Sequence, residues 1–167
     1  MPGAEGKPVG QMFPQPRVDT RSEKNLLLDD VLGPWFSVLV WGNDPRHVFD
    51  RRSLDTLTRL GVKLVSVRPT TQLHWDAAPT GDPREDLDVT VIGDSTGQLK
   101  AWFDTHPVSF VVVRPDRYVA AAAIAQHAAP VTTALATALH LTSGDDNDAR
   151  SLLDVAQPLA GALAAAG

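Results

Sequence analysis

The sequence has no cysteine among its 167 residues. Without thiols, the chain cannot form disulfides, iron–sulfur clusters or thiolate zinc sites, and it cannot carry out dithiol exchange or thiol-based peroxide reduction. The absence fits a protein of the reducing cytoplasm, and we expect a cytoplasmic location. Whatever the chain does must therefore rely on other side chains.

Long apolar runs and dense basic runs are also missing. The apolar runs at residues 36–41 and 108–113 have the length of strands, whereas a helix that crosses a bilayer needs about 20 residues. Residues 1–10 are rich in proline and glycine and lack the apolar core of a signal peptide. The formal net charge is -5, without a cluster of lysine and arginine. We therefore expect neither a membrane nor a nucleic acid as partner.

The glycine-rich motifs of nucleotide-binding proteins are absent as well. None of the 12 glycines falls in a G-x-G-x-x-G or G-x-x-x-x-G-K-[ST] pattern, so FAD has no recognisable cradle in this chain. The acidic run over residues 145–148 lacks the glycine and closing glutamate of a calcium loop, and a helix-capping loop explains it better. The histidines show no H-E-x-x-H or other metal-binding spacing: His47, His74, His106, His127 and His140. We expect no metal site.

What remains is the composition of one globular domain, with 43% hydrophobic and 21% charged residues. Runs of β-branched and aromatic residues predict strands over residues 36–41, 62–67, 89–92, 108–113 and 118–120. Apolar residues at helical spacing predict helices over residues 45–60 and 95–104. Alanine-rich helix follows residue 120, and Pro130 and Pro158 divide or begin its segments.

The order of these elements is strand, helix, strand, strand, helix, hairpin, helix. Short connections favour a parallel first pair, and the sequence Arg-Pro-Asp-Arg at residues 114–117 predicts a hairpin turn. This order predicts an α/β fold of the thioredoxin-like type, with a mixed sheet flanked by helices. Residues 1–25 show no periodicity and are interpreted as an extended arm or linker, which leaves residues 26–167 for the domain. Residues 26–33 are expected to form a short strand and a turn.

Residues 93–97 read Gly-Asp-Ser-Thr-Gly, a formal G-x-S-x-G motif between a predicted strand and a predicted helix. A serine hydrolase would use Ser95 as nucleophile, with Asp116 as acid and His127 or His140 as base. The longer parallel sheet that precedes such an elbow is missing, and so is a glycine-rich oxyanion loop. A turn whose hydroxyl groups, on Ser95 or Thr96, cap the next helix is the preferred interpretation.

Three apolar side chains stand in segments without regular structure. Trp75 lies in a long loop over residues 70–87, and loops of this length are usually functional or mobile. We expect Trp75 to pack against its own domain. For Met12 and Phe13 in the arm, docking to a partner and packing against the domain both remain open.

Four short stretches form a common pattern: Gly-Gln-Met-Phe-Pro-Gln-Pro-Arg-Val at 10–18, Leu-Asp-Asp-Val-Leu-Gly at 28–33, Asp-Ser-Thr-Gly-Gln-Leu at 94–99 with Trp102, and Arg-Pro-Asp-Arg-Tyr-Val at 114–119. Together they resemble one family, the C-terminal domain of flavin-dependent aromatic monooxygenases of the phenol hydroxylase and 3-(3-hydroxyphenyl)propionate hydroxylase type. Their order and spacing agree with that family from about residue 10 to residue 120.

The resemblance implies a thioredoxin-like lobe without catalytic, cofactor-binding or metal-binding residues. FAD, NAD(P)H and the aromatic substrate would be held by a catalytic module of the same or a companion chain, against which the lobe packs while it supports subunit association, including a possible homodimer. Twelve motif residues would have structural roles: Pro14, Gln15, Pro16, Asp29, Asp30, Gly33, Asp94, Gly97, Arg114, Pro115, Asp116 and Tyr118. The paired aspartates would fix a turn, Asp94 and Gly97 a helix start, and Pro115 with Asp116 the hairpin.

Two other functions stay open, and with them the question of whether the chain is an enzyme at all. One is a stand-alone binding module in which the loop over residues 70–87 and the alanine-rich helices enclose a small apolar ligand. The other is the Ser95 hydrolase.

Overall fold

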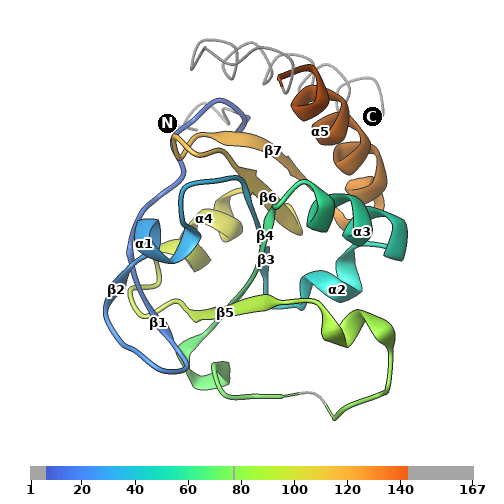
Figure 1. Cartoon of the computed structure of the whole chain (residues 1–167). Helices are drawn as coiled ribbons and strands as arrows, with labels where there is room; N and C mark the ends of the chain where they lie inside the picture. The colour runs from blue at the N-terminus through green and yellow to red at the C-terminus, as the bar shows by residue number, and fades with distance from the viewer. Residues whose placement is uncertain (1–6, 77, 143–167) are drawn as a thin grey trace.

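The computed structural model describes residues 7–76 and 78–142. Within them the chain forms one mixed seven-stranded sheet with helices on both faces (Figure 1). The predicted capping loop over residues 143–148 and the helix start at Pro158 lie outside the described residues. No helix of the described part is long and apolar enough to span a bilayer.

The sheet has the strand order β2-β1-β5-β4-β3-β6-β7. Its strands are β1 (Arg17–Thr20), β2 (Leu26–Leu27), β3 (Ser37–Trp41), β4 (Lys63–Arg68), β5 (Val89–Gly93), β6 (Phe110–Val113) and β7 (Val119–Ala123). The central strands β3, β4 and β5 are parallel, whereas β6 and β7 continue the sheet in antiparallel pairs. The predicted parallel start and antiparallel end are thus confirmed.

The two ends of the sheet differ in which strands finish there. At the cleft end, the parallel strands finish at Trp41, Arg68 and Gly93, where Trp41 pairs with Val67 and Arg68 with Gly93. At the hairpin end, β6 finishes at Val113, which pairs with Ser37 at the start of β3. The two ends lie a strand's length apart.

The helices are α1 (Leu28–Leu32), α2 (Pro45–Val48), α3 (Arg51–Arg59), α4 (Gln98–Thr105) and α5 (Ala128–Thr142), with the 3-10 turns η1 (Thr70–Gln72), η2 (Pro83–Asp86) and η3 (Ala125–His127). The single helix predicted over residues 45–60 was wrong, because Phe49 is extended and only 2% exposed. Turning Phe49 into the core interrupts the helix, and Asp50 restarts it by accepting a 2.7 Å bond from the Ser53 N–H.

Two apolar clusters lie on opposite faces of the sheet, since neighbouring residues of β3 contribute to different clusters. Val38 joins residues of α3 and α5 on one face, whereas Leu39 joins residues of α1 and α4 on the other. In Figure 1, α3 and α5 lie on the same side of the sheet. The helices of each face thus exclude water from one half of the core.

The N-terminal segment is extended, but it is built into the domain. Its residues 17–20 form β1, which pairs with both β2 and β5. Phe13 is fully buried, and its ring lies 4.9 Å from that of Trp102 in α4. The Gly10 N–H donates to the carbonyl of Val119 at 2.9 Å. Residues 10–20 of the segment expected to be an extended arm or linker thus contribute to the sheet and to the core.

Two local predictions near the hairpin end have different outcomes. The turn expected within residues 26–33 is a five-residue helix, α1, which ends at Gly33 with φ of 72°. The predicted hairpin turn is confirmed, because the Arg117 N–H donates to the Arg114 carbonyl at 2.9 Å across Pro115 and Asp116. Arg117 itself has φ of 69°, a left-handed residue that returns the chain to β7.

Candidate functional site

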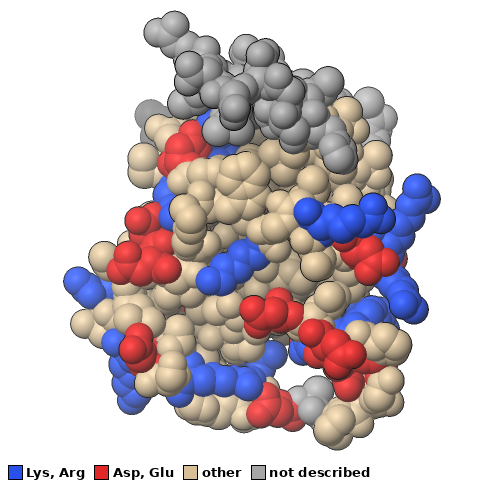
Figure 2. All heavy atoms as spheres, viewed as in Figure 1, with Lys and Arg blue, Asp and Glu red and all other residues tan. Residues whose placement is uncertain are grey.

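A cleft of about 680 Å³ lies at the end of the sheet where the parallel strands finish. Its floor comes from β4 and β5, one wall from the β3–α2 junction, and its roof from the loop over residues 70–87. Figure 2 shows a gap in the lower part of the molecule, bordered by basic and acidic side chains. No lining residue belongs to α5. This cleft is therefore not the pocket expected between the loop and the alanine-rich helices.

The register between β4 and β5 explains which side chains form the floor of the cleft. Leu64 pairs with Val89, Ser66 with Val91, and Arg68 with Gly93, so alternate residues of the two strands share one face. Leu64 and Val89 still contact the cluster under α3 and α5. Towards the cleft end the helix α2 has only four residues, and the loop over residues 70–87 covers this face in place of a longer helix.

Gly93 allows the loop to start where it does. A Cβ atom on Gly93 would lie 3.2 Å from the Thr70 methyl group and 3.3 Å from the Thr70 Cα atom, which is closer than real Cβ contacts usually are. The 3-10 turn η1 therefore packs directly on the sheet backbone at this point. The chain then folds back, so that the Trp75 carbonyl accepts a 2.6 Å bond from Arg68 Nη1.

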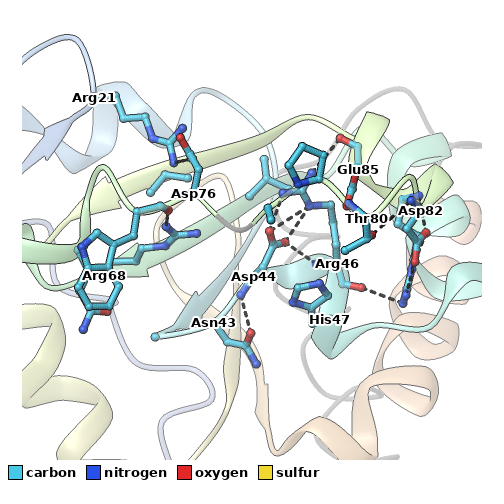
Figure 3. A pocket seen from close by; sticks show the side chains of 18 residues that line it. Arg21, Asn43, Asp44, Arg46, His47, Arg68, Asp76, Thr80, Asp82 and Glu85 are labelled. Carbon is cyan, nitrogen blue, oxygen red and sulfur yellow. Dashed lines mark hydrogen bonds and ion pairs between the residues drawn. The ribbon is translucent and has the colours of Figure 1, made fainter.

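Two Asp-Pro-Arg tripeptides clamp the other side of the cleft. In each, the aspartate before the helix accepts a 2.9 Å bond from the arginine N–H and forms a 2.6 Å ion pair with its Nη2; Asp44 and Arg46 do so at the start of α2, and Asp82 and Arg84 at the start of η2. The tripeptides also bind one another: Arg46 Nη1 donates to the Glu85 carbonyl at 2.9 Å, and Arg84 Nη1 to the Arg46 carbonyl at 3.2 Å. Figure 3 shows the paired groups at the centre and right of the cleft.

These contacts alter the acidity of the carboxyl groups. Side-chain hydrogen bonds from Arg84 lower the pKa of Asp82 to about 2. Burial raises the pKa of Asp44, but the hydrogen bonds and charge of Arg46 outweigh burial and leave the pKa below its ordinary value. The Thr80 hydroxyl and N–H lower the pKa of Glu85. All three carboxylates are therefore ionised near neutral pH.

The parallel strand–helix junctions do not fit a dinucleotide. A pyrophosphate needs free backbone N–H groups at a helix N-terminus. At the start of α2 the Asp44 carboxylate occupies the Arg46 N–H, and at the start of α4 the Asp94 carboxylate accepts a 2.8 Å bond from the Lys100 N–H. Both helix starts thus present a negative charge, which would repel the negatively charged pyrophosphate of FAD.

The G-x-S-x-G segment serves as a helix start. Gly97, in the left-handed region with φ of 74°, is the residue before α4, and the Thr96 hydroxyl accepts a long 3.4 Å bond from the N–H of Gln98, the first residue of the helix. A shorter bond to the first turn, 2.8 Å from the Lys100 N–H, is accepted by Asp94, which is 8% exposed. The Ser95 hydroxyl donates to the Arg17 carbonyl at 3.2 Å.

The hydrolase triad does not assemble from the described side chains. Asp116 lies at the hairpin end, whereas Ser95 follows β5 at the cleft end. His127 follows β7, which is four strand positions from β5 and hence roughly 19 Å away across the sheet. The side chain of His140 lies outside the described part. Within that part there is also no group of three or more potential metal ligands.

The motif residues of the hairpin end form one bonded network around Arg117. Its guanidinium pairs with Asp29 and donates a 2.6 Å bond to the Gly33 carbonyl, and its own carbonyl accepts 2.8 Å from the Phe13 N–H. Beside it, Arg114 pairs with Asp116. The network joins the N-terminal segment, α1 and the hairpin.

The remaining motif residues are placed as follows: Pro16 is buried, Pro14, Gln15, Pro115 and Tyr118 are half-buried, and Asp30 is exposed. The Gln15 side chain donates to the Phe13 carbonyl at 3.3 Å, and the Tyr118 N–H donates to Asp116 at 3.3 Å. Asp29 and Asp30 thus begin a helix, and Asp29 reaches the hairpin instead of fixing a turn.

The exposure of Trp75, Met12 and Phe13 tests whether these side chains pack against the domain. Trp75 is 66% exposed at the mouth of the cleft, so its predicted packing against the domain was wrong. In the arm, Phe13 packs into the core while Met12 is 62% exposed. Met12 borders a shallow groove with Pro14 and Trp102.

Reasoning from sequence missed the cleft and its arginines. Arg21, Arg46, Arg68 and Arg84 line it, together with four carboxylates. The repeated Asp-Pro-Arg tripeptide was a usable signal, because Asp before Pro at a helix start is a recurrent cap. Arg68 had no such signal, since only the fold of the loop brings acceptors to it.

Comparison with known proteins gives a consistent result. A family model described as the HcaD C-terminal domain matches residues 10–138. A 3-(3-hydroxy-phenyl)propionate/3-hydroxycinnamic acid hydroxylase of Mycobacterium sp. (strain KMS) is 51% identical over 154 residues, which are 90% of this chain and 26% of the relative. The corresponding protein of Comamonas testosteroni is 42% identical over 82% of this chain and 22% of its own length. The chain spans about a quarter of these relatives.

Solved structures share the fold at low identity. Thioredoxin peroxidase I of Plasmodium yoelii superposes with a TM-score of 0.55 at 18% identity, covering 85% of this chain and 97% of that one. Peroxidoxin BcpB of Mycobacterium tuberculosis gives 0.53 at 15% identity, covering 78% and 96%. The thioredoxin-like α/β fold predicted from the element order is thereby confirmed.

Proposed function

The chain belongs to the HcaD C-terminal domain family, and from this we propose that it is the noncatalytic C-terminal domain of a flavin-dependent aromatic-ring hydroxylase. The parent activity would be that named for its relatives, the hydroxylation of 3-(3-hydroxyphenyl)propionate and 3-hydroxycinnamic acid. In this role the domain packs against the catalytic module and supports subunit association, including a homodimer. FAD, NAD(P)H and the aromatic substrate are held elsewhere.

One observation carries this proposal: a sequence 51% identical to a hydroxylase over 90% of the chain accounts for only 26% of that hydroxylase. The β3–α2 junction, where thioredoxin-fold enzymes carry their reactive dithiol, reads Trp-Gly-Asn-Asp-Pro at residues 41–45. The absence of thiols argues against thiol chemistry in this domain. The carboxylates at the starts of α2 and α4 argue against FAD binding there. The twelve motif residues would then hold the fold together, and the domain boundary would lie within the N-terminal segment.

The N-terminal segment supplies a candidate contact with the catalytic module. Met12 is 62% exposed beside Trp102, and it follows directly after the start of the family match at residue 10. In a protein whose C-terminal domain this is, the rest of the hydroxylase comes before this segment and is tethered next to the groove. A tethered module reaches a nearby apolar surface at high effective concentration.

The test is reconstitution from two pieces. The Mycobacterium sp. (strain KMS) hydroxylase, shortened by the quarter that this chain matches, is purified with its flavin and mixed with the chain. We expect a complex in size-exclusion chromatography with light scattering, in which the visible absorbance of the flavin elutes with the chain. FAD titrated into the chain alone should give no saturable change in flavin fluorescence.

Two variants make the reconstitution specific. Met12→Glu places a charge in the groove and should weaken the complex, whereas Ile124→Glu, at a residue of 40% exposure after β7, should leave it unchanged. Failure of the wild-type chain to associate, or saturable binding of FAD to the chain alone, would contradict the proposed function.

A further inference from the structure

The arginines that line the cleft are not equivalent. Three of them form ion pairs with aspartates: Arg21 with Asp76, Arg46 with Asp44, and Arg84 with Asp82. Arg68 bonds to neutral acceptors instead, the Ser66 hydroxyl at 3.2 Å and the Trp75 carbonyl at 2.6 Å. Within residues 7–76 and 78–142, no carboxylate lies within ion-pair distance of its guanidinium.

The carboxylate without an arginine partner lies at the other side of the cleft. Glu85 accepts bonds from the Thr80 N–H at 2.8 Å and hydroxyl at 2.6 Å, and from the Gly81 N–H at 3.3 Å. Figure 3 shows Arg68 on the left and Glu85 on the right, with the Asp44–Arg46 ion pair between them. The acceptor capacity of Glu85 is largely used, whereas Arg68 keeps an uncompensated positive charge in a half-buried position.

Apolar surface lies on both sides of this charge. Val91 is half-buried in the floor, on the same sheet face as Ser66 and Arg68. Trp75 lines the mouth with an exposed indole, while its own carbonyl anchors Arg68. A guanidinium between an aliphatic floor and an aromatic rim suits a ligand with one negative charge and a flat ring.

More highly charged anions fit less well. Four carboxylates line the cleft: Asp44, Asp76, Asp82 and Glu85. A phosphate or dicarboxylate would bring further negative charge close to them, and like charges in one site repel. One carboxylate on the ligand matches one uncompensated arginine. The volume of about 680 Å³ is ample for a single-ring acid.

We propose that this cleft is a binding site for a small aromatic monocarboxylate, with the carboxylate on Arg68 and the ring between Val91 and Trp75. Such binding is additional to the packing role proposed above and needs no catalytic module. Failed assembly with the hydroxylase and failed binding of the acid are therefore separate results.

The test uses the full 167-residue chain with 3-phenylpropionate as probe, followed by amide and indole N–H chemical shifts. We expect saturable shifts at Arg68, Val91 and the Trp75 indole. Arg68→Gln should weaken binding roughly tenfold or more, because it removes a charge-assisted hydrogen bond. Arg52→Gln is the matched control: it removes one positive charge at an exposed residue of α3 that does not line the cleft, and the affinity should stay within about twofold.

Two further measurements keep the result clear if Arg68→Gln does not fold. Arg68→Lys keeps the charge and should bind more tightly than Arg68→Gln but less tightly than wild type. The neutral isostere 3-phenylpropanamide should bind wild type roughly tenfold more weakly than the acid. The proposal is overturned if 3-phenylpropionate gives no saturable shifts with the wild-type chain. It is also overturned if 3-phenylpropanamide binds the wild-type chain as tightly as 3-phenylpropionate does, or if Arg68→Lys binds 3-phenylpropionate as tightly as the wild-type chain does.

Discussion

At the hairpin end of the sheet, the side chains of Arg114 and Arg117 are 3% and 13% exposed, whereas at the cleft end those of Arg21 and Arg84 are 41% and 37% exposed. Arg117 joins segments that are 84 and 88 positions apart, but Arg84 pairs with an aspartate two positions away. Arginine–aspartate pairs thus hold distant segments together at the hairpin end and line an open surface at the cleft end. Burial, and not the number of ion pairs, decides the difference.

The largest effect is expected at the hairpin end, for Phe13→Ala. Phe13 is fully buried against Trp102, and truncating a buried phenylalanine costs about 3–5 kcal/mol of unfolding free energy. Chemical denaturation followed by tryptophan fluorescence measures the loss. Met12→Ala, next to it and exposed, should change stability by less than about 0.5 kcal/mol. Equal effects would mean that the N-terminal segment is not part of the core.

Arg117→Ala should have the next largest effect, about 2 kcal/mol of stability, since it leaves the Gly33 carbonyl and Asp29 without their donor. The same denaturation experiment applies. Arg84→Ala is the control from the cleft end and should lower the denaturation midpoint much less, because the side chain of this arginine is 37% exposed. A reversal of the two results would refute the contrast drawn between the two ends.

Gly93→Ala tests how the loop is seated on the sheet. The added methyl group meets Thr70 at 3.2–3.3 Å, so η1 must move, at a cost of about 1 kcal/mol. Limited proteolysis should then cut the loop over residues 70–87 faster than in wild type. Gly42→Ala, where φ is 66° but no atom of the described residues lies within 4 Å of the added methyl group, separates backbone strain from crowding, because it should not change cleavage of that loop.

The smallest effect concerns acid pH at the cleft end. Asp82 has its folded-state pKa lowered to about 2 from 3.8, so its contribution to folding is present above the unfolded value and is lost as pH falls through the folded value. Between about pH 4 and pH 2, the clamp between η2 and α2 should loosen. A carboxyl NMR titration gives the pKa directly. In Arg84→Gln this pKa should return towards 3.8; an unchanged value would mean that Arg84 is not its cause.

Much of the fold was predictable because local sequence carried it. The runs that form β3, β4, β5 and β6 combine β-branched residues with turn signals, and Pro115 with Asp116 fixes a turn within four residues. The prediction of a single helix over residues 45–60 was wrong because a tertiary contact, and not the local sequence, decides the conformation there. The apolar spacing of these residues is helical, but burial of Phe49 in the core overrides that preference.

The candidate site was much less predictable. The absence of cysteine and of glycine-rich motifs could be read directly, and the capping geometry of each Asp-Pro-Arg tripeptide is a local property. Trp75 was misjudged because exposure is set by what the rest of the chain covers. Arg68 could not be selected from the arginines of the sequence, since its lack of a carboxylate partner depends on where the other arginines and aspartates lie.

The sequence by itself determined the element order, the exclusion of thiol chemistry and the family to which the chain belongs, because residue types and short spacings suffice for these. Only the tertiary structure decided that the N-terminal segment joins the sheet, that Arg117 links α1 to the hairpin, and that a cleft opens beside Arg68. These features depend on contacts between residues far apart in the chain. Such contacts form only when the whole core excludes water and fixes the ends of the sheet.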